Sequence, residues 1–227
     1  MARYGSVLLA GILFAVEFIL IFQGLLYTTA SRATLFIYLA PFFVVLGARI
    51  VLPADRFSIA QWLGLALSFC GMVIAFGIPA PATDPKQLTG DIMMVGAAPF
   101  WAATTLTIKA SPLTRTSAQK VMLYQLVVSA PVIAVAALLV GERVTNMPSG
   151  LAFGALAYQT IWVVSVTFVI WFALIARYSA SRLSAFTFLT PLFGVAAGHL
   201  VLDDPLTPAF AAAVALVAVG LLLVNRS

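Results

Sequence analysis

The chain has 227 residues, of which 63% are hydrophobic and only 8% are charged, with a formal net charge of +5. A soluble domain carries roughly 25% charged residues because its surface must meet water, so this composition excludes a soluble globular protein. The mean hydropathy of +1.11 instead predicts a chain whose main solvent is lipid. The basic residues are scattered singly, which argues against nucleic-acid binding and favours a role in setting membrane orientation.

Apolar runs long enough to cross a bilayer recur along the chain. Roughly 20 apolar residues in a helix span the hydrocarbon core. Because the runs are continuous rather than alternating, they predict helices and exclude a β-barrel. We therefore expect an all-α polytopic membrane protein with eight transmembrane helices. The expected spans are about 6–27, 31–52, 58–79, 90–109, 118–140, 151–175, 180–202 and 207–224.

The first span carries an acidic residue, Glu17, near its middle. An ionised carboxylate at that depth costs several kcal/mol unless it is paired, hydrated or protonated. It is either a neutral acid bonded to a neighbouring helix, or a cavity group that couples to protons or recognises a cation. Because ionisable residues inside spans usually serve function, we favour the second role. The neighbours of Glu17 on its own helix are apolar, so we expect a partner on another span, such as Tyr38.

The second and seventh spans are copies of one another. Residues 31–52 and 181–202 align without a gap and are identical at nine of 22 positions, including a proline near the middle of each. A repeated apolar segment interrupted by proline is the sequence feature that best indicates a transporter's binding site. Each proline, Pro41 and Pro191, removes a backbone donor and can expose a carbonyl oxygen to a cavity. We therefore place both prolines in the predicted site.

Polar and aromatic side chains in the middle of other spans are further candidates for the cavity wall. In span 151–175, Tyr158, Trp162 and Ser165 fall at i, i+4 and i+7 and share one face of an α-helix. Such a stripe fits packing or an interfacial belt equally well, and hydroxyl residues in span 180–202 also fit close helix packing. The predicted substrate-binding or coupling residues are Glu17, Tyr38, Pro41, Trp101, Thr105, Tyr158, Trp162, Ser165, Thr187, Thr190 and Pro191.

No sequence pattern indicates an enzyme, a cofactor or a metal site. There is no Gly-rich loop followed by Lys and Ser or Thr, no nucleophile with its base, and no pair of catalytic carboxylates. The single histidine, His199, has no second histidine to complete a metal site and is a poor candidate for a metal ligand. We expect a protein that binds no cofactor and is driven by gradients rather than ATP.

The basic residues predict the orientation of the spans. When the connections alternate between two faces, nine basic residues fall on one face and three on the other. The nine are Arg3, Arg49, Arg56, Lys109, Arg115, Lys120, Arg177, Arg182 and Arg226, and the three are Arg32, Lys86 and Arg143. Because cytoplasmic loops carry the excess of Lys and Arg, we expect the first face, with both termini, to be cytoplasmic. The two copies then cross the membrane in opposite directions, which predicts an inverted repeat.

The two halves that contain these copies are unequal in length. We expect a partial first repeat of three spans in 1–80, a linker at 81–89, and a second repeat of five spans in 90–227. Spans 90–109 and 118–140 have no counterpart in the first half. A complete inverted repeat would need two further helices before residue 1.

Several short motifs extend along most of the chain. They are Tyr27-Thr-Thr-Ala-Ser31-Arg32, Tyr38-Leu-Ala-Pro41, Gln61-Trp-Leu-Gly-Leu-Ala-Leu67 with Gly71, Ala180-Ser-Arg182, Leu189-Thr-Pro-Leu-Phe193, Asp204-Pro-Leu-Thr207, and Gly220 with Val224-Asn-Arg226. In this order they resemble the EamA-type members of the drug/metabolite transporter superfamily. The resemblance implies a ten-helix carrier of two five-helix inverted repeats that exports amino acids, metabolites or drugs. This chain departs from that pattern by lacking the first two helices.

The sequence thus predicts a secondary transporter of the bacterial inner membrane. We expect it to export a small amphipathic metabolite, amino acid or drug-like solute by alternating access, and Glu17 slightly favours a cationic or zwitterionic one. The alternative is a truncated, inactive or scaffold membrane protein that needs a partner chain. The expected partners are membrane lipid and a small-molecule substrate, not nucleic acid, while coupling to protons and a homodimer stay open.

Overall fold

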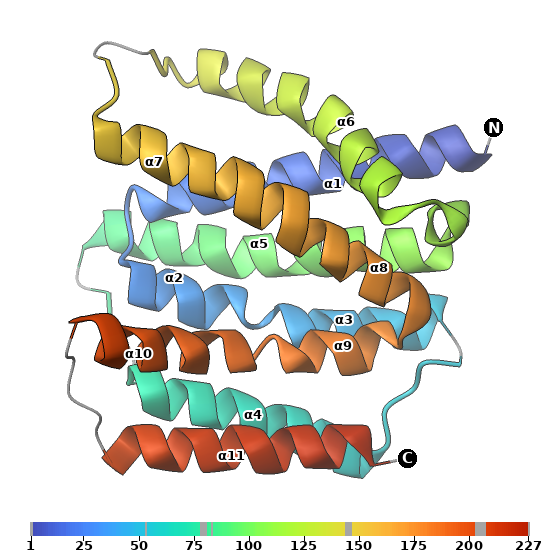
Figure 1. Cartoon of the computed structure of the whole chain (residues 1–227), viewed down its shortest axis with the longest axis vertical. Coiled ribbons are helices and arrows are strands. Elements are labelled where there is room, and N and C mark those ends of the chain that lie inside the picture. Colours follow the sequence, from blue (N-terminus) through green and yellow to red (C-terminus); the bar gives the residue numbers. More distant parts are fainter. Residues whose placement is uncertain are drawn as a thin grey trace.

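The protein is a bundle of helices whose long axes run across the molecule, with both termini at the same end (Figure 1). The computed structural model describes residues 2–52, 54–77, 81–82, 84–143, 147–202 and 208–226, and these residues form helices without strands. The helices are α1 (Ala2–Leu25), α2 (Ala30–Ile37), α3 (Ala40–Val51), α4 (Ile59–Phe76), α5 (Pro85–Ala110), η1 (Pro112–Arg115), α6 (Ala118–Leu139), α7 (Gly150–Tyr158), η2 (Gln159–Phe168), α8 (Val169–Arg177), α9 (Ala180–Phe186), α10 (Leu189–Leu202) and α11 (Pro208–Asn225).

Seven helical stretches in the described residues are long and apolar enough to cross a membrane. The eighth predicted span, 180–202, corresponds to α9 and α10. The predicted all-α polytopic membrane fold is therefore confirmed. One boundary moves by several residues: α5 begins at Pro85 rather than near 90, because Asp84 caps it by accepting a hydrogen bond from the Lys86 backbone N–H at 2.9 Å.

The two sequence copies are each split into two helices rather than forming one continuous span. The helix is interrupted at residues 38–39 between α2 and α3, and at 187–188 between α9 and α10. In the register of the repeat, the two breaks differ by a single residue. Pro41 and Pro191 lie in the first turn of the following helices, α3 and α10, where a missing N–H costs no helical hydrogen bond.

The next pair of repeated helices, α4 and α11, is packed at backbone level. A Cβ atom at Gly64 would lie 2.5 Å from the carbonyl oxygen of Gly220, and one at Gly71 would lie 2.8 Å from that of Ala213. Early residues of one helix thus meet late residues of the other, so the helices are antiparallel. With an offset of 149 residues, Gly64 corresponds to Ala213 and Gly71 to Gly220, so the repeat exchanges the two contacts.

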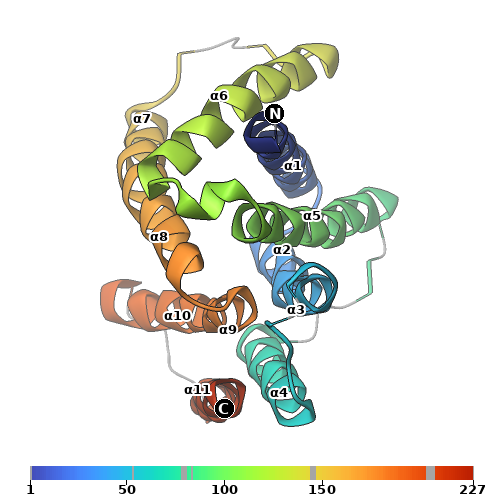
Figure 2. The same ribbon diagram turned by 90° about the vertical axis from the view of Figure 1, so that its right-hand side faces the viewer.

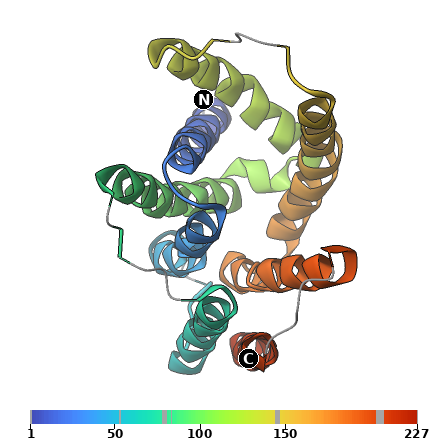
Figure 3. The ribbon, with the colours of Figure 1, turned by 90° about the vertical axis from the view of Figure 1, so that its left-hand side faces the viewer.

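The helices are layered along the longest dimension of the molecule. The α4–α11 pair lies at the bottom of all three views and α6 at the top (Figures 1, 2 and 3). Between them, α1 and α5 lie on one side and the α7–α8 segment on the other (Figures 2 and 3). One cluster of buried apolar residues joins α1, α5, α6 and α8, and a second joins α4, α9, α10 and α11.

The end of the bundle that holds both termini is tied together at the corner between α8 and α9. Asp55, which follows α3, accepts hydrogen bonds from the Ser179 hydroxyl at 2.6 Å and from the Ser181 backbone N–H at 3.2 Å. Lys109, in the last turn of α5, donates to the carbonyl oxygens of Ile175 at 2.7 Å and Tyr178 at 2.8 Å. These contacts join α3, α5, α8 and α9. The lysine cation satisfies free carbonyl groups at the C-terminus of α8, and the aspartate anion satisfies a free N–H group at the N-terminus of α9.

The opposite end carries an ion pair between the start of α2 and α5. The Arg32 guanidinium binds both carboxylate oxygens of Asp91, which is almost fully buried. The Thr28 hydroxyl donates to the same carboxylate at 2.6 Å. This network satisfies a charge that would otherwise be costly to bury.

Candidate functional site

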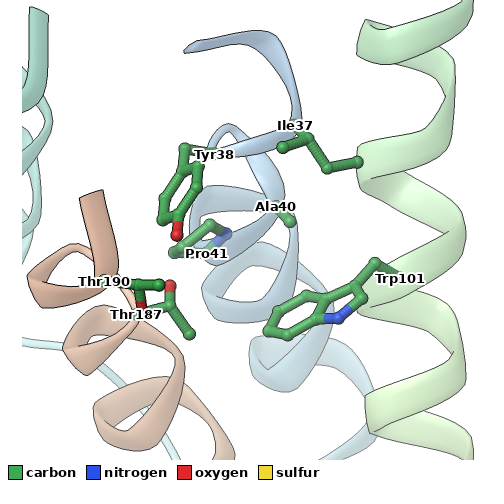
Figure 4. A pocket seen from close by; sticks show the side chains of 7 residues that line it. All are labelled: Ile37, Tyr38, Ala40, Pro41, Trp101, Thr187 and Thr190. Carbon is green, nitrogen blue, oxygen red and sulfur yellow. The ribbon is translucent and has the colours of Figure 1, made fainter. Parts of the chain in front are cut away.

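A cavity of about 200 Å³ lies at the two helix breaks, where the repeated segments face one another (Figure 4). Its wall is formed by Ile37, Tyr38, Ala40, Pro41, Trp101, Thr187 and Thr190. The Tyr38 hydroxyl lies against Thr190. The rings of Tyr38 and Phe188, which occupy equivalent positions in the two copies, have centroids 5.9 Å apart. The breaks therefore bring the two copies into contact beside an open space.

A second cavity of about 550 Å³ adjoins the first, because Trp101 and Thr190 line both. Its remaining wall comes from α7, η2 and α8, through Tyr158, Trp162, Val163, Thr167, Phe168, Ile170, Trp171 and Leu174. Ligand cavities of roughly 300–1,000 Å³ with apolar walls and a few polar groups hold small organic molecules. This pair of cavities matches that description.

The wall helix contains a π-helical segment, η2, in place of the α-helix that the sequence predicts. The Ser165 hydroxyl donates to the Thr160 carbonyl at 2.8 Å, and the Thr167 hydroxyl donates to the Trp162 carbonyl at 3.0 Å, each five residues back. A π-helix has more residues per turn, so the i, i+4, i+7 face of an α-helix does not persist through it. Tyr158 and Trp162 line the large cavity, whereas Ser165 does not.

Glu17 lies in a third, very small cavity of about 10 Å³ between α1, α5 and the η2–α8 segment. Its other lining residues are Phe14, Trp101, Thr104, Thr105, Phe168, Trp171 and Phe172. Glu17 is only 3% exposed, and among the described residues its Oε2 atom has no hydrogen-bond partner. Tyr38, an expected partner, lies against Thr190 instead, and the hydroxyl groups beside Glu17 come from α5.

The structure brings together nine of the eleven predicted site residues. Glu17, Tyr38, Pro41, Trp101, Thr105, Tyr158, Trp162, Thr187 and Thr190 line the three adjoining cavities. Ser165 is exposed within η2, and Pro191 is buried in the first turn of α10 and lines none of these three cavities. Trp101 borders all three cavities and is therefore the residue around which they are arranged.

Sequence reasoning missed two features of this site. Phe168 and Trp171 each line both the large cavity and the Glu17 cavity. The ring centroids of Trp101 and Trp171 lie 5.3 Å apart, and those of Phe14 and Phe168 lie 5.8 Å apart. The π-helical segment sets the rotation of these residues, and no α-helical periodicity could have indicated it.

The site is almost entirely uncharged. Among the residues that line the three cavities, only Glu17 is ionisable to a carboxylate, and the others are apolar, aromatic, hydroxyl-bearing or proline. No group of three or more His, Cys, Asp and Glu residues that could hold a metal ion occurs in the part of the chain that the structure describes. The arrangement can enclose an amphipathic molecule and place one acid group behind the cavity wall.

Comparison with known proteins gives consistent matches over nearly the whole chain. The sequence model of the EamA-like transporter family matches residues 2–77 and 88–226. The uncharacterized transporter YvbV of Bacillus subtilis (strain 168) is 24% identical over 207 residues, which cover 89% of this chain and 65% of that protein. An uncharacterized transporter of Archaeoglobus fulgidus is 25% identical over 209 residues, which cover 89% of this chain and 70% of that protein.

The fold is also found among solved structures. One crystal structure superposes with a TM-score of 0.82 at 21% sequence identity, covering 96% of this chain and 75% of the other. The chain thus spans only about two thirds of the length of the Bacillus and Archaeoglobus relatives and three quarters of that solved chain.

Proposed function

The chain belongs to the EamA-like transporter family, and from this premise we propose that it is a secondary transporter that exports a small amphipathic solute across a bacterial inner membrane. The solute is a metabolite, amino acid or drug-like molecule, and its carrier is not an enzyme. A cationic or zwitterionic solute fits better than an anion, because no basic side chain lines the cavities and the Glu17 carboxyl group, which the solute does not touch, lies behind their wall.

The observation that carries this proposal is the position of the adjoining cavities at the matched breaks of the two sequence copies. A substrate site between broken helices of inverted repeats is the arrangement by which secondary transporters work. The Tyr38 hydroxyl, the Thr187 and Thr190 side chains and the Trp101 ring supply both hydrogen-bonding and apolar surface there. These groups suit a molecule with one polar end and one apolar end.

Alternating access requires that the two ends of the cavity open in turn. The Asp55 and Lys109 contacts hold α3, α5, α8 and α9 together at the end that contains both termini. We assign this end to the cytoplasm, because nine of the twelve basic residues belong to it by the alternation of the spans. Opening towards the cytoplasm would then require these contacts to break.

Uptake into proteoliposomes tests the proposal. The longest polypeptide that the gene encodes is purified and reconstituted into vesicles. The vesicles are offered radiolabelled cationic, zwitterionic and anionic amphipathic solutes, with protein-free vesicles as the blank. We expect uptake of at least one cationic or zwitterionic solute without covalent change. Tyr38→Phe should lower its uptake by about two- to tenfold, because the net value of one hydrogen bond is about 0.5–1.5 kcal/mol. Tyr178→Phe, at an exposed ring outside the cavities, is the matched control.

No uptake of any solute by a folded protein would contradict the proposal. So would equal losses in the Tyr38 and Tyr178 variants, because only the first ring faces the cavity.

A second candidate, a membrane protein that works only with a partner chain, is favoured by one observation. Within Gly150–Arg177, only 11% of the 18-residue apolar segment that would cross the membrane is buried in the protein, against 50% within Pro85–Ala110. α5 packs on α1 and on α2–α3. The repeat relates α1 to the α7–α8 segment, and it relates α2–α3 to α9–α10. Within the described residues, no helix packs on both α7–α8 and α9–α10 as closely as α5 packs on α1 and on α2–α3. We keep the division into a three-span repeat (1–80), a linker (81–89) and a five-span repeat (90–227) as part of this proposal.

Partner chains would co-purify stoichiometrically with an active preparation under the second candidate, and a pure single chain that transports would exclude it.

A further inference from the structure

The acid group of the site is enclosed in a cavity of its own. Glu17 lines the 10 Å³ cavity and lines neither of the two larger ones. One water molecule needs about 10–15 Å³ of such volume, so the Glu17 cavity holds one water molecule at most. An organic solute therefore cannot reach the Glu17 carboxyl group in this conformation. Whatever binds there is the size of a proton or a single small ion.

The oxygen atoms in this small cavity are few. The side-chain oxygens belong to the Glu17 carboxyl group and to the hydroxyls of Thr104 and Thr105, while the other lining residues are aromatic. Hard metal cations need a shell of about six or more oxygen ligands, which these side chains do not provide. A protonated carboxyl group needs only one acceptor for its O–H. The Thr104 Oγ1 atom is buried and, among the described residues, unpartnered, as is Glu17 Oε2.

No second charge in the described structure compensates Glu17. The helices packed on α1 are α2, α5, α6 and η1, and the η2–α8 segment reaches it through Phe168 and Phe172. The titratable groups on these elements are Arg32, Lys86, Asp91, Lys109, Arg115, Lys120, Tyr124, Arg177 and, beside them, Tyr158 and Tyr178. None of them lines the Glu17 cavity. Arg32 is bound to Asp91, and Lys109 is bound to the carbonyls at the end of α8.

Aromatic rings form the partition between the acid group and the 550 Å³ cavity. Trp101, Phe168 and Trp171 each line both the 550 Å³ cavity and the Glu17 cavity. The Trp101 and Trp171 rings are in tilted contact at 5.3 Å. A change in either ring that follows solute binding would alter the access of water to Glu17.

We propose that Glu17 is a proton-binding site separated from the solute cavity by the Trp101–Trp171 partition, so that solute binding and proton exchange communicate through these two rings. The inference rests on the proposed transport function and specifies its coupling ion. In the binding step, Glu17 Oε2 takes a proton from hydronium that reaches the cavity, leaving a neutral carboxylic acid and a water molecule. In the release step, the acid returns the proton to water once the partition opens.

Infrared spectroscopy tests the proton site without any substrate. As the pH is lowered, neutral carboxylic acids give carbonyl stretching bands, and the band of Glu17 should be missing from the spectrum of Glu17→Gln while the bands of the other six acidic residues stay. Glu142→Gln is the matched control, because Glu142 is an exposed carboxylate that accepts a hydrogen bond from Gln23 at the surface. We expect the control to keep the band. A spectrum that Glu17→Gln leaves unchanged contradicts the proposal, and so does a Glu17 band that Na⁺ removes at constant pH when choline does not.

Proton leak into vesicles tests the partition. Vesicles that contain a pH-sensitive dye are given an inward electrical driving force with valinomycin and K⁺, and no solute is added. Trp101→Ala should raise proton entry by about tenfold, the change expected for a barrier lowered by ~1.4 kcal/mol. Trp101→Phe, which keeps a ring, should raise it less. Adding Glu17→Gln to Trp101→Ala should return proton entry to the wild-type level.

These outcomes separate the inference from the proposed function. If the Trp101→Ala leak survives Glu17→Gln, protons do not pass by Glu17 and the inference is wrong, even when solute uptake is intact. If the infrared band and the leak behave as expected while no solute is carried, the proton site stands and the transport proposal is wrong. Should Trp101→Ala not fold, Trp171→Phe probes the same ring contact.

Discussion

The α4–α11 pair and the α7–η2–α8 segment are built in opposite ways. In α4, backbone atoms of α11 lie where a Cβ on Gly64 or Gly71 would have to be placed. In α7, a Cβ on Gly154 would meet nothing within 4 Å. In α4, 33% of the 18-residue apolar segment is buried in the protein, but in Gly150–Arg177 only 11% of such a segment is buried. The first region is held by backbone contact, whereas the second is a thin wall beside the 550 Å³ cavity.

This difference indicates which parts of the molecule are fixed and which can move. Close backbone contact between helices removes the alternative packings that a side-chain interface allows. Regions with few buried contacts open at the lowest free energy, and moving parts of proteins come from such regions. A π-helical segment adds a second source of adaptability, because its ladder can change register with an α-helical one. We therefore expect α4 and α11 to act as the scaffold and η2 as the moving wall.

The largest expected effect comes from adding one methyl group to each region. Gly64→Ala should destabilise the fold by about 1–3 kcal/mol, because the new Cβ meets backbone atoms that cannot rotate away. Gly154→Ala should instead stabilise slightly, by up to about 1 kcal/mol, since alanine favours a helix and the space is open. Thermal unfolding followed by fluorescence-detected size exclusion measures both. Equal stabilities for the two variants would remove the contrast between scaffold and wall.

A smaller effect is expected where the wall is tied down. Lys109→Met should remove the hydrogen bonds to Ile175 and Tyr178 and destabilise the end of α8 locally by about 1–2 kcal/mol. Hydrogen exchange of residues 169–177 should accelerate, while exchange in α4 and α11 stays unchanged. Lys109→Arg keeps a cation with several N–H donors and should behave more like the wild type. Faster exchange throughout the molecule would show that Lys109 supports the whole bundle and not this corner alone.

The smallest effect concerns two neighbouring side chains of η2. Trp162→Ala should weaken solute binding by about fivefold, because an aromatic ring is lost from the cavity wall. Ser165→Ala should change it by less than about twofold, because in the described structure its hydroxyl donates to the Thr160 carbonyl and not into a cavity. Binding to the purified protein, measured by quenching of a fluorescent cationic amphiphile, compares the two. A larger loss at Ser165 would mean that the wall turns Ser165 into the cavity when solute binds.

Much of the candidate site could be predicted from the sequence because the repeat marks it. The proline at matched positions of the two copies indicated the region in which Tyr38, Pro41 and Thr190 lie. The roles of charged residues at helix ends could not be predicted in this way. The sequence placed Lys109 only among the basic residues of the expected cytoplasmic face, yet it binds carbonyl groups of a helix 66 residues away in sequence. Its partners depend on which helices are neighbours, and hydropathy carries no such information.

By itself the sequence determined the solvent, the class of fold and the duplicated element. Apolar runs of membrane length force their backbone groups into helices, and this requirement is local to each run. Only the tertiary structure decided that α2–α3 and α9–α10 break within one residue of each other in repeat register, and that a π-helical segment turns Ser165 away from the cavities. It also decided that the Trp101 ring stands between Glu17 and the larger cavities. The sequence could not predict these features, because each depends on the distance and rotation between helices. Packing among segments far apart in the chain fixes that distance and rotation.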